Sequence, residues 1–329
     1  MNGTGYWPSP WPAEDGGAAR RQIARGVPSL AGRRFEVRTR EVPAATMVVV
    51  RDPGEVYLLR HTAGDDAVAW VERLDPRSLE PIERSPDLPG GPTWPGGVAC
   101  HADGSLHVVF GDHAHRLAPD CSVLAARTLP RHRPYNSFVV LADGTLVTKD
   151  FGGSRPGHPV AAADREPCEL VALDPVTLED RARLVLPEAS IARLSALDDV
   201  VSVVGDTSLL RVRWDGDRFD LIDRMAYRTL DGQTYGWDCV LAGDGTTWFL
   251  DDGDGSEGYT GTLRGHGRSG CPLHLVRVGA DGGVAMVEVS GLPGGLVANP
   301  PAVDEAEARR HADATIAAYT AWDPTAAEG

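Results

Sequence analysis

Short apolar stretches alternate with tight polar turns along most of the chain. Each unit starts with an apolar strand, crosses a turn rich in Asp and Gly, and continues into a second apolar strand. The second strands read EVYLLR, SLHVVF, TLVTKD, VVSVVG and TTWFLD, which alternate and carry many β-branched residues. This pattern predicts five antiparallel strand pairs. Their turns are Asp52-Pro53-Gly54, Asp103-Gly104, Asp143-Gly144, Asp198-Asp199 and Asp244-Gly245.

A second, more polar hairpin follows each of these pairs. The second hairpins read VERLDPRSLEPIE, AHRLAPDCSVLAA, LVALDPVTLEDRARL, LRVRWDGDRFDLID and HLVRVGADGGVAMVE. Successive first turns stand 40 to 56 residues apart, which is typical of the four-stranded blades of a propeller. The sequence therefore predicts an all-β fold, a six-bladed β-propeller, with a seven-bladed ring as the alternative.

The sixth blade needs a strand from elsewhere in the chain. Residues 43–290 hold five complete units, and the remaining C-terminal residues offer too few strands for a sixth. The alternating segment RRFEVRTREV, residues 33–42, is predicted to supply the missing outer strand and so to close the ring. The domains are then an N-terminal extension over 1–32 and a propeller over 33–329. A helix over 304–319 is the competing interpretation of the C-terminal part, because good helix formers follow an acidic start.

The overall charge narrows the class of partner. A net charge of −15 argues against nucleic acid and against an anionic membrane surface, both of which need clustered Lys and Arg. No run of 18 apolar residues and no leader pattern is present, so we expect a cytoplasmic protein with a small-molecule substrate. The five cysteines include no CxxC pair, which favours buried thiols over disulfides or a thiolate metal site. The oligomeric state is not indicated.

Polar residues recur at one end of the predicted strands. In a blade, the start of the first strand and the end of the second strand lie at the same mouth of the channel. Asn136 and Asp238 stand out, because they lie inside strands that otherwise favour apolar residues, although polar residues are ordinary in loops. The other polar or small residues of this mouth are Thr46, Gly97, Ser137, Arg193 and Asn299, with Arg60, His61, Asp112, His113, Lys149, Asp150, Asp206, Asp251 and Asp252 at the second-strand ends.

Lys149 is the only lysine among 32 basic residues. A compact ammonium differs from a guanidinium in shape and in how readily its pKa shifts, so this lysine is a candidate functional residue, with chance survival as the alternative. It is predicted to pair with Asp150 or with a carboxylate of a neighbouring blade, or to contact the ligand. Trp94, Tyr135, Trp237 and Tyr259 are predicted to gather at the same mouth, where Trp94, Tyr135, Trp237, Asn299 and Asp150 would bind substrate. The long loops at residues 151–167 and 251–270 are either lids or insertions.

Three short motifs give no firm site. The GxGxxG match at residues 265–270 lacks the flanking strand and helix of a dinucleotide site. Asp252, Asp254 and Ser256 alternate like the start of a calcium loop, but the required Gly and Glu are missing. His113 and His115 form an HxH pair without an evident third ligand.

The segment RHRPYNSFVVLADGTLVTKD, residues 131–150, resembles the signature of the senescence-marker-protein and gluconolactonase family of six-bladed propellers. The resemblance implies that Asn136 is a metal-binding asparagine and that Asp238, in YGWDCVLAGDG, is a metal ligand and base for lactone or ester hydrolysis. A divalent cation such as Ca²⁺ is then the implied cofactor. The sequence departs from the family where a second asparagine is expected, since SIARLSA offers Arg193 instead.

These residues predict an enzyme that acts on a small oxygenated metabolite at the channel mouth, with lactone or ester hydrolysis as the resemblance implies. Asp238 would be the base or ligand, Asn136 a ligand or oxyanion donor, and Arg193 or Lys149 would stabilise negative charge. A metal-independent cyclase or isomerase in the same pocket is one alternative. A non-catalytic propeller that binds a ligand or a protein is another.

Overall fold

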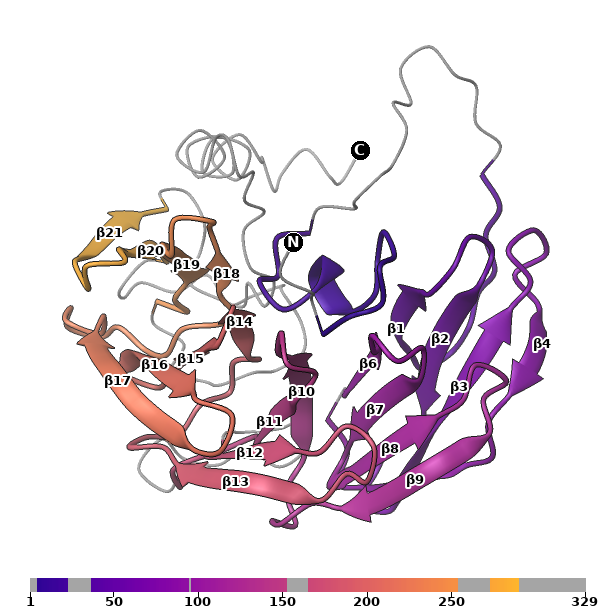
Figure 1. Cartoon of the computed structure of the whole chain (residues 1–329). Helices are drawn as coiled ribbons and strands as arrows, with labels where there is room; N and C mark the ends of the chain where they lie inside the picture. The colour runs from indigo at the N-terminus through magenta and orange to yellow at the C-terminus, as the bar shows by residue number, and fades with distance from the viewer. Residues whose placement is uncertain (1–4, 23–36, 95, 153–164, 254–272, 290–329) are drawn as a thin grey trace.

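The described residues form five antiparallel sheets that stand around a common axis (Figure 1). The computed structural model describes residues 5–22, 37–94, 96–152, 165–253 and 273–289. Each sheet runs in chain order from the axis outwards, as in the blades of a propeller. Its elements are η1 (Glu14–Gly16); β1 (Ala45–Val50), β2 (Val56–His61), β3 (Ala67–Leu74), β4 (Pro81–Arg84) and β5 (Leu88–Gly91); β6 (Gly97–Cys100), β7 (Leu106–Phe110), β8 (His113–Leu117) and β9 (Val123–Thr128); β10 (Tyr135–Val140), β11 (Leu146–Asp150), β12 (Glu169–Leu173) and β13 (Asp180–Val185); β14 (Ser195–Leu197), β15 (Val200–Val204), β16 (Ser208–Trp214) and β17 (Phe219–Ala226); β18 (Val240–Leu241), β19 (Thr247–Leu250), β20 (His274–Val278) and β21 (Val284–Glu288).

The five predicted first turns are confirmed, and each joins the two innermost strands of a sheet. Gly104, Gly144 and Gly245 have φ of 87°, 87° and 81°, a left-handed conformation that glycine adopts without steric cost. In the fourth sheet Asp198 takes a similar conformation, with φ of 55°. Aspartate tolerates it better than most residues because its short side chain can hydrogen-bond the local backbone.

The second hairpins are also confirmed, and burial decreases from the axis to the rim. In β12 all residues but the first are buried, whereas the outer strand β13 alternates half-buried with exposed positions. The alternation follows from the period of two in a strand whose one face packs on the neighbouring sheet while the other meets water. The apolar strand pairs predicted first in each unit are therefore the inner strands of the sheets, and the more polar second hairpins extend to the surface.

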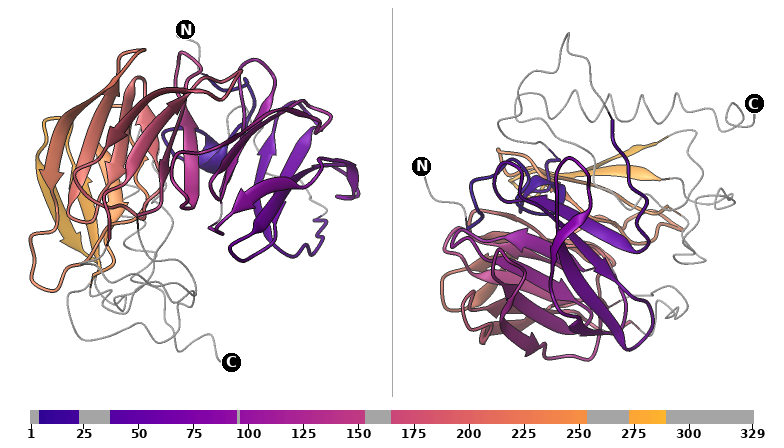
Figure 2. Two further views of the ribbon diagram at one scale, coloured as in Figure 1. Left: turned by 90° about the horizontal axis from the view of Figure 1, so that it is seen from below. Right: turned by 90° about the vertical axis from the view of Figure 1, so that its right-hand side faces the viewer.

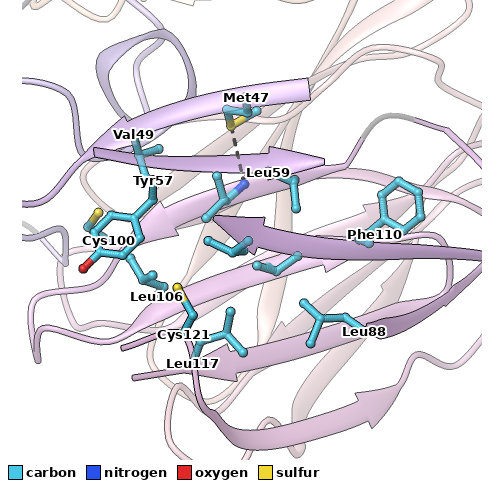
Figure 3. Close-up of a cluster of buried hydrophobic side chains, with 14 of the residues drawn as sticks. Met47, Val49, Tyr57, Leu59, Leu88, Cys100, Leu106, Phe110, Leu117 and Cys121 are labelled. Atoms are coloured by element: carbon cyan, nitrogen blue, oxygen red, sulfur yellow. Dashed lines mark hydrogen bonds between the residues drawn. The ribbon is translucent and has the colours of Figure 1, made fainter. Parts of the chain in front are cut away.

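Adjacent sheets pack face to face through apolar clusters. Between the first two sheets, Tyr57 and Leu59 of β2 meet Leu106 of β7 and Cys100 of β6, and all four side chains are fully buried (Figure 3). Burying a side chain the size of leucine contributes roughly 1.5 to 3 kcal/mol relative to leaving it exposed. Clusters of the same kind join the second sheet to the third, the third to the fourth and the fourth to the fifth. These contacts hold the described sheets in their order around the axis.

Residues 5–22 lie at the centre of the ring and hydrogen-bond to all five inner strands (Figures 1 and 2). We call this part of the chain the axial segment. An inner strand has an unpaired edge toward the axis, so its free N–H and C=O groups need partners. The bonds run from Val50 N to Trp11 O, from Cys100 N to Pro12 O, from Val140 N to the Tyr6 hydroxyl, from Ala196 N to Ala18 O, and from Leu241 N to Ala19 O.

Arg20 fixes the axial segment in its folded shape. The guanidinium is 2% exposed, and its Nη1 lies 2.9 Å from both Glu14 Oε2 and Asp15 Oδ2. Its Nε donates to the carbonyl of Leu194, just before β14, over 2.6 Å. The charge of this buried arginine is thus balanced inside the segment, and the same side chain ties the segment to the fourth sheet.

The predicted ring-closing strand over residues 33–42 is wrong for the part that the structure describes. Residues 37–42 form no strand, and Val37 is 81% exposed. Arg38 and Arg40 instead donate to the carbonyls of Arg77 and Leu79, in the turn between β3 and β4. These contacts hold the segment against the turn between β3 and β4 without strand pairing.

The number of blades stays a prediction, because residues 290–329 lie outside the described part of the chain. The competing helix over 304–319 lies there as well. The predicted domain boundary falls within 23–36, which is also not described, although residues 5–22 of the predicted extension occupy the ring axis. Among the described residues, no helix is long and apolar enough to cross a membrane.

We expect Arg20→Met to destabilise the fold by about 3 kcal/mol, because it leaves Glu14 and Asp15 without their buried partner. This is the low end of the range for breaking a buried ion pair, since the two acids remain partly exposed. Arg213→Met is the matched control, because Arg213 pairs with Asp199 at an exposed site and should change stability by less than about 1 kcal/mol. Urea unfolding of the three proteins measures this, and equal effects of the two substitutions would contradict the role of Arg20.

Candidate functional site

The strand register brings the predicted mouth residues to one end of the sheets. Tyr135, at the start of β10, pairs with Asp150 at the end of β11. Gly236, just before β18, forms a bridge with Asp251, just after β19. Antiparallel pairing therefore places first-strand starts beside second-strand ends, as the sequence predicts. The Asp-Gly turns lie at the opposite end of the same strands.

Asp238 and Arg193 form a buried ion pair at this mouth. The backbone N–H of Arg193 donates to Asp238 Oδ1 over 2.6 Å, and its Nη1 donates to Oδ2 over 3.0 Å. Asp238 is 2% exposed. Burial by itself would lower the pKa of Arg193, but the carboxylates of Glu14 and Asp238 raise it above its ordinary value. The guanidinium therefore keeps its charge in this environment.

Glu14 of the axial segment reaches the same arginine from within the ring. Its Oε1 lies 3.2 Å from Arg193 Nε, so the guanidinium sits between two carboxylates. Glu14 also pairs with Arg20, which links the axial network to the mouth. Periodicity in the sequence carries no signal for this contact, because Glu14 and Arg193 lie far apart in the chain.

A calcium ion, which the family resemblance implies, does not fit the surroundings of Asp238. Both carboxylate oxygens already accept hydrogen bonds from Arg193, and calcium takes six to eight oxygen ligands. A guanidinium 3.0 Å from the carboxylate also repels a second cation at that position. Asn136 lies in β10, but its side chain is outside the described part of the structure. The metal assignment to Asn136 and Asp238 stays a prediction that this ion pair disfavours.

Lys149 is fully buried in β11 and faces backbone oxygens. Its Nζ lies 3.2 Å from the carbonyl of Ser190 and 3.4 Å from that of Asp150. The nearby Cys168 thiol also bonds to Ser190, as donor to its carbonyl and as acceptor from its N–H. Burial raises the pKa of Cys168, and the neighbouring ammonium acts against that rise. Lys149 thus joins the third sheet to the loop that precedes β14.

Asp150, predicted as a substrate-binding residue, is occupied by protein groups. It is fully buried, and its Oδ1 accepts from the backbone N–H of Glu169 over 2.5 Å. Its Oδ2 accepts from Arg131 and Arg133, over 3.3 and 2.9 Å. These contacts hold the start of β12 and the loop before β10 against the end of β11. Asp150 therefore shapes the mouth through the loop that it anchors.

Four aromatic side chains gather at the mouth together with Ile191. Trp94 stacks on Phe151 with ring centroids 4.4 Å apart, and Tyr235 meets Trp237 edge to face at 5.8 Å. The predicted grouping of Trp94 and Trp237 is thus observed, whereas Tyr135 is buried in a different cluster between the second and third sheets. Arg165, paired with Asp206, lies over the ring of Tyr235 at 4.7 Å.

Asp252 is a buried carboxyl at this mouth with a raised pKa. The carboxyl is 3% exposed, next to Tyr235 and Trp237. Burial raises its pKa to about 7, with the charge of Asp251 adding to the rise and the Trp237 and Tyr235 side chains opposing it. The sequence predicts that Asp252 lies at the mouth, because it follows the end of β19 next to Asp251. The raised pKa could not be predicted from the sequence, because it depends on the burial of the carboxyl.

Asp251 has a structural environment that explains its burial. Its Oδ1 accepts from the backbone N–H groups of Gly253 and His274, and its Oδ2 from the side chains of Gln233 and His274. This carboxylate therefore fastens β19 to the start of β20. Asn299, Tyr259 and most of the two long loops lie outside the described residues, and their roles stay predictions.

We expect the stability of the wild-type protein, relative to Asp252→Asn, to fall as the pH rises from about 4 to about 7. The folded carboxyl keeps its proton up to about 7, whereas the unfolded one releases it near 4, so the folded state binds more protons across this window. The slope is at most about 1.4 kcal/mol per pH unit. Urea unfolding of both proteins from pH 4.5 to 8.5 measures the difference. Asp231→Asn, on an exposed carboxyl, is the control, and a difference for Asp252 that does not vary with pH would refute the altered acidity.

Lys149→Arg tests whether this position requires an ammonium. The side chain is fully buried against two carbonyls, so we expect the larger planar guanidinium to cost about 1 to 3 kcal/mol of stability. Lys149→Met keeps the length but leaves both carbonyls without this donor, which should cost a similar amount. Thermal unfolding measures both variants. An arginine variant with the same melting temperature as the wild type would show that the site accommodates a guanidinium and that packing does not require the lysine.

No family model and no curated protein sequence matches the chain. Among solved structures it is similar to a streptogramin B lyase, with a TM-score of 0.45 and 12% identity, over 76% of this chain and 85% of the other. It is also similar to KlHsv2 with loop 6CD replaced by a Gly-Ser linker, with a TM-score of 0.43 and 10% identity, over 77% and 73% of the two chains. Likenesses this weak say nothing about function, so the assignment of the chain as an all-β propeller rests on its own sheets.

Proposed function

We propose that the chain is an enzyme that acts on a small oxygenated metabolite at the channel mouth by acid–base catalysis without a metal ion. The observation that carries the proposal is the buried carboxyl of Asp252, whose pKa lies at about 7 among aromatic side chains. A group with this acidity is close to half ionised at neutral pH, which suits both uptake and release of a proton. Perturbed carboxyls of this kind concentrate at functional sites.

Lactone or ester hydrolysis is the first reaction to test. In this reaction ionised Asp252 takes a proton from a water molecule as the water oxygen attacks the carbonyl carbon. The bond from that carbon to the ring or ester oxygen then breaks, and the proton passes to the leaving oxygen. The products are a carboxylic acid and a hydroxyl group, so atoms and charge balance without another reactant.

The cationic side chains of the mouth would stabilise the negative charge that develops on the carbonyl oxygen. Arg193 keeps its charge between Glu14 and Asp238, and Lys149 brings an ammonium to the loop before β14. A fixed positive charge in a poorly solvated site favours an oxyanion more than it would in water. In this arrangement Asp238 orients Arg193, while Asp252 takes over the proton transfer that the family resemblance assigns to Asp238.

The aromatic cluster favours a substrate with a flat apolar body. Trp94 and Trp237 are large and rigid, and their rings can bind a ring-shaped substrate without a large loss of side-chain entropy. The same acid–base group would also serve a cyclase or isomerase, because both reactions move a proton near a carbonyl. The ion pair at Asp238, which disfavours a metal, supports this second, metal-independent alternative equally.

A panel of small lactones and esters, followed by NMR in the presence of EDTA, tests the proposal. We expect turnover to persist with the chelator and to fall by roughly 10² to 10⁴-fold in Asp252→Asn, the range for losing a general acid or base. Ligand binding, followed by tryptophan fluorescence, should change much less. Asp231→Asn, on an exposed carboxyl, is the matched control and should keep full activity.

Three outcomes decide among the alternatives. Product spectra that show ring closure or a shifted double bond would replace the hydrolase with the cyclase or isomerase. Activity that EDTA abolishes and Ca²⁺ restores would overturn the metal-independent mechanism. Binding without turnover of any compound would favour the non-catalytic propeller and would remove the catalytic role of Asp252.

A further inference from the structure

The innermost turns of the second and third sheets differ at three buried positions, and at two of them the second sheet has histidine where the third has an apolar residue. Residues 101–107 read HADGSLH, and the corresponding residues 141–147 of the third sheet read LADGTLV. Leu141 and Val147 are core residues, 2% and 0% exposed. Their counterparts His101 and His107 are buried as well, at 6% and 1%. Two histidines therefore occupy positions that the third sheet fills with apolar side chains.

The two histidines converge on the carboxylate of the turn between them. One ligand atom from each of His101, Asp103 and His107 lies within 4.8 Å of the other two. Within the described ranges this is the one set of three His, Cys, Asp or Glu side chains that meets that criterion. The imidazoles of His101 and His107 stand 5.2 Å apart, edge to face. His101 Nδ1 lies 3.0 Å from Asp103 Oδ1.

The hydrogen bonds of His101 set the tautomer that a metal ligand needs. Its Nε2 lies 3.1 Å from the carbonyl of Gly144, and since a carbonyl can only accept, Nε2 carries the proton. Nδ1 therefore has a lone pair, which now accepts the backbone N–H of Asp103 over 3.2 Å. Metal-bound histidines usually donate their second nitrogen to a carbonyl or carboxylate in this way.

His107 is the most deeply buried of the three groups, at 1% exposed. Its Nε2 lies 3.2 Å from the hydroxyl of Ser105, which also donates to Asp103. In the described part of the chain, the buried Nδ1 of His107 has no hydrogen-bond partner.

The remaining contacts of Asp103 leave one oxygen for a metal. Arg116 donates to Oδ2 over 2.9 Å and would hold that oxygen away from the ion. Oδ1 accepts from the backbone N–H and the hydroxyl of Ser105, over 2.9 and 2.6 Å. The hydroxyl can rotate and release a lone pair of Oδ1. The Ser105 hydroxyl therefore contacts both Asp103 and His107.

We propose that His101, Asp103 and His107 form a binding site for a divalent transition-metal ion at the turn end of the second sheet, opposite the candidate active site. Two imidazole nitrogens and one carboxylate oxygen suit Zn²⁺, which is bound by three such protein ligands plus water in open sites. The site is independent of the proposed enzyme activity. It would hold the inner hairpin of the second sheet against the turn of the third through His101 and Gly144.

Titration of the tag-free full chain with Co²⁺ and Zn²⁺ tests this site. Co²⁺ bound by these ligands should give visible absorption bands, which one equivalent of Zn²⁺ should remove. The double variant His101→Leu/His107→Val takes the residues of the third sheet at the same positions, so we expect it to fold. It should lose the bands and weaken Zn²⁺ binding by more than the roughly 10 to 100-fold typical of losing an outer-shell partner. Asp103→Asn should weaken binding to a lesser degree.

His132→Ala is the matched control, because its imidazole is 78% exposed and lies outside the cluster. This variant should bind Co²⁺ and Zn²⁺ as the wild type does. Bound Zn²⁺ should raise the melting temperature of the wild type and of the control but not that of the double variant. Equal Zn²⁺ affinity in the wild type and the double variant, or no visible Co²⁺ bands in the wild type, would overturn the proposal. Neither readout depends on turnover, so failure of the metal-site proposal can be distinguished from failure of the proposed enzyme activity.

Discussion

The inner strands of a propeller have no sheet partner on the side that faces the axis, and in this chain the axial segment supplies partners to all five described sheets. A buried donor or acceptor without a partner costs roughly 1 to 3 kcal/mol. Residues 5–22 remove several such costs at once, because backbone groups of one short segment bond to β1, β6, β14 and β18 and the Tyr6 hydroxyl bonds to β10. The segment therefore also fixes the spacing between sheets whose own contacts are only with their neighbours.

The same segment connects the fold to the chemistry at the mouth. Arg20 is held by Glu14 and Asp15, and Glu14 in turn holds Arg193, which pairs with Asp238. The position of the Arg193 guanidinium thus depends on residues from both ends of the described chain. A shift of the axial segment would change the electrostatic interactions of Arg193, since charges in a low-dielectric environment are only weakly screened. The axial segment and the predicted site residues Arg193 and Asp238 therefore belong to one network of ion pairs.

The repeat was predictable from the sequence because its signals are local. An Asp-Gly pair demands a left-handed turn residue, and β-branched runs on either side demand strands, so Asp143-Gly144 could be read without tertiary information. The axial segment has no such signal, since prolines and glycines dominate it and its partners lie in distant strands. The altered acidity of Asp252 was hidden for a similar reason, because it depends on burial by Tyr235 and Trp237 and not on neighbours in sequence alone.

The two ends of the inner strands differ in which groups contact their carboxylates. At the mouth, guanidinium groups bond to Asp238 and Asp150, so protein groups already neutralise both carboxylates. At the turn of the second sheet, Asp103 faces two imidazoles. Arg116 compensates only one oxygen there. The carboxylates at the two ends of the same strands thus have different partners, because the sequence places Arg at the first end and His at the second.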